Sequence, residues 1–303
     1  MKLRARLGLS PVVTCRAILA TVFLLAVALN VPCVRADVGI ESWVQRYNND
    51  NGSTEYATKI IRDSANNVIV VGYMDKGVSG YDMLVIKYSS AGTPLWTNRY
   101  DSDFSLNDQA VGAALDSGGN IYVTGSSEKS SGGNDFVTLK YSSAGVGLWT
   151  NRFVASGSQA GPKAIAVNGN DEVIVAGQGS GSNGYDFFTV KYNSAGVLLW
   201  TNRFSSLGIA NEYVAALEVD SSNNVLVTGY SYTGSGNDFV TLKLNNLGIP
   251  LWTNGYNGAA NGYDQAYALG VNTNGDVVVA GNSDGGASYY DFVTIKYSAG
   301  GVP

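Results

Sequence analysis

Four carboxylates occupy one position of a recurring pattern, each directly before a stretch rich in small residues. They are Glu55, Asp108, Glu212 and Asp264, and Ala160 takes the same position in the remaining copy. Carboxylate oxygens are the ligands that a hard cation such as Ca²⁺ prefers. One interpretation is therefore a calcium site built from these four acids. The alternative is that each acid accepts hydrogen bonds from a neighbouring loop, because a residue that repeats usually serves the repeat.

A second group combines tyrosine rings with short amide side chains. A ring that carries a hydroxyl can pack on a sugar or a protein surface, and asparagine supplies hydrogen bonds beside it. The predicted ligand-binding residues are Tyr81, Tyr185, Tyr232, Tyr290, Asn134, Asn183 and Asn237. We expect a glycan or a cell-surface protein as the ligand. The alternative is an ordinary set of loops, rich in Gly and Ser, with scattered tyrosines.

A fixed repeat places these residues. The segment DFVTLKYSSAGVGLWTNRF, residues 135–153, recurs with small changes from Asp82, Asp186 and Asp238, and its first part recurs from Asp291. The five aspartates are spaced by 53, 51, 52 and 53 positions. A period of about 50 residues indicates a repeat architecture, in which each unit packs only against its neighbours.

One repeat contains four short strands. Residues 95–100 (LWTNRY), 110–117 (AVGAALDS), 121–127 (IYVTGSS) and 135–141 (DFVTLKY) are separated by segments rich in Gly, Ser, Asn and Asp. Those residues favour turns, and four antiparallel strands per repeat are typical of a β-propeller. The fold class predicted is therefore all-β, a β-propeller of five four-stranded blades. The strand rich in Ala and Gly is expected next to the axis, where blades crowd together.

The order of the strands also predicts how the ring closes. The first strand expected is residues 41–47, ESWVQRY, which matches the outer strand LWTNRY, and the last is residues 291–297, DFVTIKY. We expect the first to pair with the last and complete the final blade, because closure removes exposed sheet edges. The alternative is that the chain is a fragment of a larger propeller, cut at a repeat boundary.

A lysine recurs five residues after each of the five aspartates. The lysines are Lys87, Lys140, Lys191, Lys243 and Lys296. They are expected near the hairpin turns that begin at Asp63, Asp116 and Asp220. Pairs of this kind are expected to lie at the surface, where an ion pair adds little to stability.

Two stretches carry a resemblance to a known family. Residues 114–125 read ALDSGGNIYVTG and residues 217–229 read LEVDSSNNVLVTG, each followed by the DF…KY strand. These repeats resemble the secreted bacterial β-propeller repeat family known as SBBP. The resemblance covers nearly all of residues 42–297 and implies a propeller fold. The family name implies seven blades, whereas this chain has five repeats.

The N-terminus has the pattern of a secretory signal peptide. Basic residues precede an apolar run over residues 17–31, and Val34 and Ala36 stand at the −3 and −1 positions of a cleavage site. The alternative is a retained N-terminal anchor. The predicted domains are a signal peptide of residues 1–36 and a β-propeller of residues 37–303. The protein is expected to be secreted or periplasmic, and no membrane span is expected after cleavage. Without the signal peptide the chain has 14 basic and 24 acidic residues, a net charge of −10. Such a surface repels nucleic acid and anionic membranes.

Enzyme activity is not expected. The sequence has no histidine, which excludes catalytic triads that use imidazole and ordinary zinc sites. The alternative is an enzyme resembling propeller glycosidases, which use paired carboxylates. The acids that break the repeat, and that such an enzyme would use, are Asp75, Asp101, Asp103, Glu128 and Asp284. A purely structural surface protein is a further alternative. No cofactor is expected, apart from the calcium interpretation given above.

Overall fold

The computed structural model describes residues 42–48, 52–77, 80–103, 105–155, 157, 159–181, 184–206, 211–232, 234, 236–286 and 289–303. The chain divides into two units, residues 1–44 and residues 45–303, and every described strand lies in the second. The predicted signal peptide, residues 1–36, lies outside the described residues. No helix in the described ranges is long and apolar enough to cross a bilayer.

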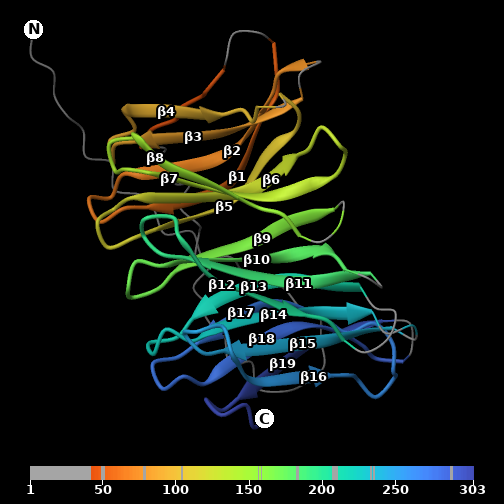
Figure 1. Ribbon diagram of the computed structural model, residues 1–303. Coiled ribbons are helices and arrows are strands. Elements are labelled where there is room, and N and C mark those ends of the chain that lie inside the picture. Colours follow the sequence, from red (N-terminus) through yellow and green to blue (C-terminus); the bar gives the residue numbers. More distant parts are fainter. Residues whose placement is uncertain are drawn as a thin grey trace, which may run out of the picture. The chain divides into compact units, whose positions relative to one another are not determined.

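The second unit is all-β and consists of five antiparallel sheets in chain order (Figure 1). Each sheet is a meander in which consecutive strands pair. The strands are β1 (Glu55–Arg62), β2 (Val68–Asp75), β3 (Tyr81–Tyr88) and β4 (Pro94–Tyr100); β5 (Asp108–Leu115), β6 (Ile121–Glu128), β7 (Asn134–Tyr141) and β8 (Gly147–Phe153); β9 (Ala160–Val167), β10 (Val173–Ser180), β11 (Tyr185–Tyr192) and β12 (Leu198–Phe204); β13 (Asn211–Val219), β14 (Val225–Tyr232), β15 (Asn237–Leu244) and β16 (Pro250–Tyr256); β17 (Gln265–Val271), β18 (Val277–Asp284) and β19 (Tyr290–Tyr297).

The core lies between successive sheets. One cluster joins Ile69 and Met83 of the first sheet to Ala110 and Ile121 of the second. Three further clusters join the second sheet to the third, the third to the fourth and the fourth to the fifth. In each of these interfaces the first strand of one sheet packs against the sheet before it, and first strands lie beside one another. This arrangement confirms that the strands rich in Ala and Gly lie where the sheets converge.

Each of the first four sheets also holds the next one through three side chains. Lys140 Nζ and Trp149 Nε1 both donate to the carbonyl of Ser194, at 3.0 and 3.1 Å. Asn151 Nδ2 donates to the carbonyl of Gly196 at 2.6 Å. We call this set the inter-sheet clamp. The same clamp is formed by Lys87, Trp96 and Asn98; by Lys191, Trp200 and Asn202; and by Lys243, Trp252 and Asn254.

The repeated lysine pairs with a carboxylate of its own sheet, as predicted. Lys140 Nζ lies 3.1 Å from Asp116 Oδ2, and both side chains are almost fully buried. Equivalent pairs join Lys87 to Asp63 and Lys243 to Asp220, each at 2.9 Å. The expectation that such pairs lie at the surface is wrong for these sheets, because the clamp covers the lysine with the turn of the next sheet.

The turns of the third and fifth sheets keep this pair with different residues. In the other sheets the turn begins with Asp and has Asn four residues later, as in Asp116 and Asn120. The third sheet has the reverse order, Asn168 and then Glu172, and Lys191 pairs with Glu172. The fifth sheet is also reversed, with Asn272 and then Asp276, which pairs with Lys296 at 2.9 Å. Each turn therefore holds one carboxylate and one amide, whichever comes first.

The predicted closing strand is not formed in the residues that the structure describes. Residues 43–48 adopt no regular secondary structure, and the last sheet has three strands among the described residues. Phe292 of β19 is 87% exposed, whereas the equivalent Phe136, Phe187 and Phe239 are at most 1% exposed. Over residues 42–47, the described part of the strand predicted for residues 41–47, no strand is therefore observed, and Tyr47 instead packs against the cluster of the first sheet that includes Met74 and Tyr88. Closure of the ring stays a prediction.

Candidate functional site

Three positions in each sheet converge where the strands meet the longer loops. In the second sheet they are Gln109 of β5, Ser126 of β6 and Asn134 of β7. The other sheets have equivalent positions on their first, second and third strands. The first two pair directly, as Gln109 with Ser126 and Tyr213 with Tyr230. Between sheets these positions vary widely, while the residues around them repeat. Variation on a repeated frame is what a binding surface requires.

These positions line two adjoining pockets. The first has a volume of about 280 Å³ and is lined by Tyr81, Asn107, Gln109, Ser126, Glu128, Gly133, Asn134 and Gln159. The second has a volume of about 390 Å³ and is lined by Ser126, Asn134, Gln159, Ala160, Gly161, Gln178, Tyr185 and Tyr213. Because Ser126, Asn134 and Gln159 line both, the pockets form one continuous depression, which we call the polar groove. It extends from the first sheet to the fourth.

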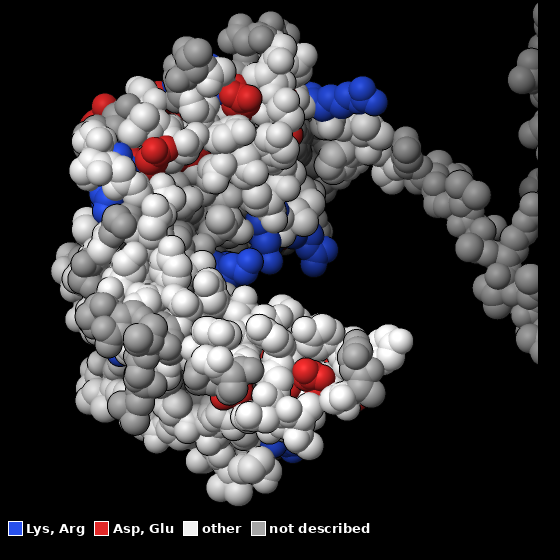
Figure 2. All heavy atoms as spheres, turned by 90° about the vertical axis from the view of Figure 1, so that its right-hand side faces the viewer, with Lys and Arg blue, Asp and Glu red and all other residues white. Residues whose placement is uncertain are grey.

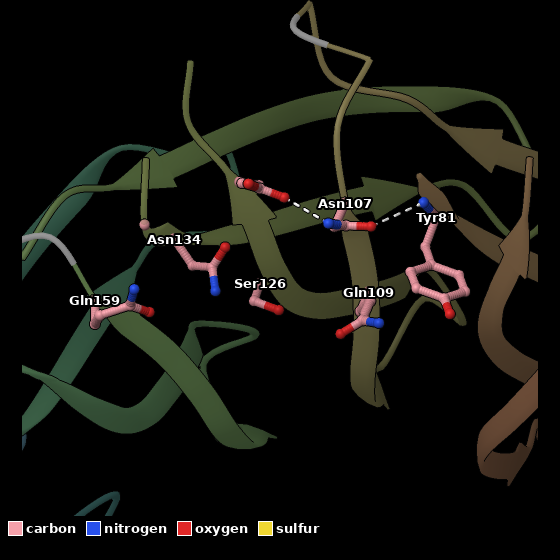
Figure 3. A pocket seen from close by; sticks show the side chains of 8 residues that line it. Tyr81, Asn107, Gln109, Ser126, Asn134 and Gln159 are labelled. Atoms are coloured by element: carbon pink, nitrogen blue, oxygen red, sulfur yellow. Dashed lines mark hydrogen bonds between the residues drawn. The ribbon is translucent and has the colours of Figure 1, made fainter. Parts of the chain in front are cut away.

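Side chains in the middle of the groove are polar and open to a ligand. Figure 3 shows Gln109, Ser126, Asn134 and Gln159 in a row beside the pocket. Among the described residues, none of these four side chains makes a hydrogen bond, and Gln178 Oε1 is buried without a partner. An amide offers two donor hydrogens and two acceptor lone pairs. The groove therefore presents several free donors and acceptors at once, and water or a ligand has to satisfy them.

Tyrosines bound the groove at both ends. Tyr73 and Tyr81 meet edge to face with ring centroids 5.2 Å apart, and Tyr56 stacks on Tyr73 at 4.9 Å. At the other end Tyr213 contacts Tyr185 at 6.0 Å and Tyr230 at 5.2 Å. Ring contacts of this kind hold the tyrosines in fixed orientations. The groove is thus a polar channel between two rigid aromatic clusters.

Asn107 fixes one wall of the groove. Its Oδ1 accepts from the backbone N–H of Tyr81 at 3.2 Å, and its Nδ2 donates to Glu128 Oε2 at 2.5 Å (Figure 3). Glu128 is the one carboxylate among the lining residues that the structure describes. The other acids proposed for an enzyme lie elsewhere: Asp101 pairs with Lys76, and Asp75 and Asp284 accept from nearby backbone N–H groups.

The structure brings together three of the predicted ligand-binding residues. Tyr81, Asn134 and Tyr185 line the polar groove. Tyr232 and Tyr290 are exposed but do not line either pocket, and Asn237 is only 7% exposed. Asn183 lies outside the described residues. Four lining residues were not predicted from the sequence: Gln109, Ser126, Gln178 and Tyr213. An alignment of the repeats shows that their strand positions vary.

The four acids of the calcium interpretation occupy repeated positions at the start of the first strands. Asp108 accepts from the backbone N–H of Ser102 at 2.7 Å, Glu212 from Ser206 at 3.0 Å and Asp264 from Gly258 at 2.8 Å. Glu55 accepts from Ser53 Oγ at 3.1 Å. Each acid thus anchors the loop that precedes its own strand.

Burial of these carboxylates has an electrostatic effect. Asp108, Glu212 and Asp264 are fully buried, and burial raises the pKa of Asp108 despite its hydrogen bonds to Ser127 and Ser102. In the part of the chain that the structure describes, no three acids converge on a point where a cation could bind. The geometry favours the loop-anchoring interpretation, and a calcium site stays a prediction.

Comparisons with known proteins support the propeller fold. No family model matches the chain. The chain is 26% identical over 291 residues to an uncharacterised WD repeat-containing protein of Acanthamoeba polyphaga mimivirus. That match covers 84% of this chain but only 18% of the viral protein, so the chain spans less than a fifth of its relative.

Solved structures that superpose on the chain include a lyase and a protease domain. The polysaccharide lyase Uly1 superposes with a TM-score of 0.56 at 12% identity, over 89% of this chain and 76% of the lyase. The β-propeller domain of the Trilobed protease from Pyrococcus furiosus has a TM-score of 0.48 at 7% identity, over 80% of this chain and 69% of that domain. At 12% identity the likeness to Uly1 concerns the fold alone. The chain is a β-propeller repeat protein, and the resemblance to SBBP repeats stays a prediction.

Proposed function

We propose that this protein is an exported β-propeller module that binds a carbohydrate chain in the polar groove. The observation that carries the proposal is the row of unpaired amide and hydroxyl side chains between two tyrosine clusters. A sugar chain presents hydroxyl groups that both donate and accept hydrogen bonds, and apolar ring faces that pack on tyrosine. The groove offers both partners along its length. Export rests on the signal-peptide pattern of residues 1–36.

A binding role is favoured over catalysis. Glu128 is the single carboxylate lining the described part of the groove, whereas glycosidases use two carboxylates that flank the bond. A purely structural role is disfavoured by the groove itself. Buried or half-buried amides without partners cost stability, and such groups commonly persist where a ligand satisfies them.

The proposal predicts loss of sugar binding when the groove is changed. Replacing both Gln109 and Gln178 by Ala is expected to weaken binding of an oligosaccharide at least tenfold, since two amide contacts of about 1 kcal/mol each are lost. Binding would first be sought on a glycan array and then measured by calorimetry on the mature protein. The oligosaccharide should be recovered unchanged, as expected of a protein that is not an enzyme.

A matched control separates groove effects from general ones. Tyr289→Ala removes an aromatic side chain that is 78% exposed and does not line the groove, so affinity should stay the same. Melting temperatures of all variants would be compared by circular dichroism. Full affinity in the Gln109→Ala, Gln178→Ala double variant, or turnover of the oligosaccharide, would contradict the proposal.

We also propose that residues 41–47 close the propeller by pairing with β19. Their sequence matches the outer strands of the other sheets, and no described strand fills the outer position of the last sheet. Closure would also cover Phe292, whose equivalents in the second, third and fourth sheets are buried. By analogy with the pairing of Thr189 and Asn202 in the third sheet, Thr294 would lie opposite Gln45.

Paired cysteines test the closure. Both natural cysteines, Cys15 and Cys33, lie within the predicted signal peptide, so the mature chain offers no competing thiol. Thr294→Cys combined with Gln45→Cys is expected to form an intramolecular disulfide on mild oxidation. Thr294→Cys with Val44→Cys is the control, because neighbouring strand residues point to opposite faces. Equal crosslinking in both variants, or crosslinks only between molecules, would rule the pairing out.

A further inference from the structure

Most cationic side chains of this protein are paired, and the exceptions are not randomly placed. Ten of the fourteen Lys and Arg residues between positions 37 and 303 form ion pairs. Within the described residues the four that form none are Arg46, Lys59, Arg62 and Lys163. Three of these four lie on β1 and β9, which are the first strands of their sheets.

Both strands begin beside the polar groove or its aromatic clusters. Lys163 follows Gly161, which lines the groove, by two residues, or about 7 Å along the strand. Lys59 follows Tyr56 of the aromatic cluster by three residues, or about 10 Å. Both lysines are exposed. Since an extended lysine side chain spans most of the shorter distance, the ammonium group of Lys163 can reach a chain lying in the groove, and that of Lys59 can reach a chain that continues past Tyr56 along β1.

The surroundings of the two lysines leave them available. First strands of successive sheets lie side by side, and Figure 2 shows Lys and Arg side chains gathered in the hollow of this face. Two acids belong to the same region. Glu128 lines the groove. Burial raises the pKa of Glu218 of β13, and the charge of Lys59 offsets part of this effect. Neither acid forms an ion pair with Lys59 or Lys163 among the described residues.

We infer that the chain bound in the polar groove is an acidic oligosaccharide, whose carboxylate or sulfate groups bind Lys59 and Lys163. This inference rests on the proposed function and adds the ligand's charge. The net charge of −10 disfavours polyanions in general, but a cleft that concentrates one sign of charge attracts its ligand locally. Unpaired cations are uncommon in this chain, so their position beside unpaired amides distinguishes this cleft from the rest of the surface.

The test compares three probes of equal length: oligogalacturonate, a sulfated galactan oligosaccharide and a neutral galactan oligosaccharide. Oligogalacturonate carries carboxylates and the sulfated galactan carries sulfates. Comparing the affinities of these two probes therefore shows which anionic group the protein prefers. The Lys59→Gln, Lys163→Gln double variant is expected to weaken binding of the preferred acidic probe at least tenfold, because a hydrogen bond to a charged group contributes about 1.5–3 kcal/mol. The affinity of the wild type should also fall as salt is raised.

Lys296→Gln is the control, since Lys296 is 62% exposed, pairs with Asp276 and does not line the groove. It removes the same charge and should leave affinity unchanged. If the neutral probe binds as tightly as the acidic ones, and the double variant binds normally, the inference about charge is wrong while the groove remains a sugar site. If no probe binds the wild type, the proposed function itself fails, and the inference fails with it.

Discussion

Replacing Asp116 by alanine is expected to lower the free energy of unfolding by about 3–5 kcal/mol, because it leaves a buried cation unpaired. Lys140 is 5% exposed, and its ammonium lies between Asp116 and the carbonyl of Ser194 in the next sheet. Asp116 also accepts from the backbone and side chain of Asn120. The loss is a large share of the stability of an ordinary domain. Chemical denaturation of the mature protein measures it.

The chain contains a matched control for this change. Asp276→Ala removes the equivalent carboxylate from the fifth sheet, where Lys296 is 62% exposed. A cation that water can solvate does not need its partner, so little change in stability is expected. Equal destabilisation by Asp116→Ala and Asp276→Ala would show that burial of the lysine is not what makes the pair important.

The effect should also depend on pH. Burial alone would raise the pKa of Asp116, but hydrogen bonds from Asn120 and Lys140 outweigh it and hold the pKa below its ordinary value. A carboxyl group whose pKa is lower in the folded state stabilises the fold fully above its unfolded pKa, about 3.9, and loses this effect as the pH falls further. The difference in stability between wild type and Asp116→Ala should therefore shrink below about pH 4.

Replacing Gly145 by alanine is expected to be nearly as damaging. Gly145 lies in the turn that the clamp of the first sheet holds, with a φ of +84°, and an added Cβ would lie 2.7 Å from Trp96. The left-handed backbone costs alanine about 1–2 kcal/mol, and overpacking against Trp96 adds about 1–3 kcal/mol. Thermal and denaturant unfolding would both report the loss.

Gly132 separates the two contributions. It has the same φ of +84°, but an added Cβ there would meet no atom within 4 Å. Gly132→Ala should therefore show the backbone cost alone. If Gly145→Ala is no worse than Gly132→Ala, the contact between Trp96 and the turn contributes nothing to the packing of the first two sheets.

Local features of the fold were predictable because they repeat. The alternation of strand and turn residues in each copy predicts four-stranded meanders, and the small residues of the first strands predict their place where sheets converge. Pairing of residues 41–47 with β19 would join distant parts of the chain, and it stays a prediction that rests on the match of ESWVQRY to the outer strands. The burial of Lys140 and Lys191 was also missed, because it depends on a turn contributed by the next sheet.

The candidate site was predictable only in part. Loop-facing residues such as Tyr81, Asn134 and Tyr185 stand out because tyrosine and asparagine are common in binding loops. Gln109, Ser126 and Gln178 lie within strands, where a polar residue is ordinarily attributed to the solvent-exposed face. For the acids before the first strands the sequence left two interpretations open, a metal site or loop anchoring, and their hydrogen bonds to Ser102, Ser206 and Gly258 favour the second.

The reversed order of acid and amide in the turns at Asn168 and Asn272 has an evolutionary consequence. A change from Asp to Asn at the first turn position removes the partner of a lysine, and a change from Asn to an acid four residues later restores it. We therefore expect substitutions at these two positions to be coupled. When repeats or relatives are aligned, each position alone will look poorly conserved, while the two together will covary.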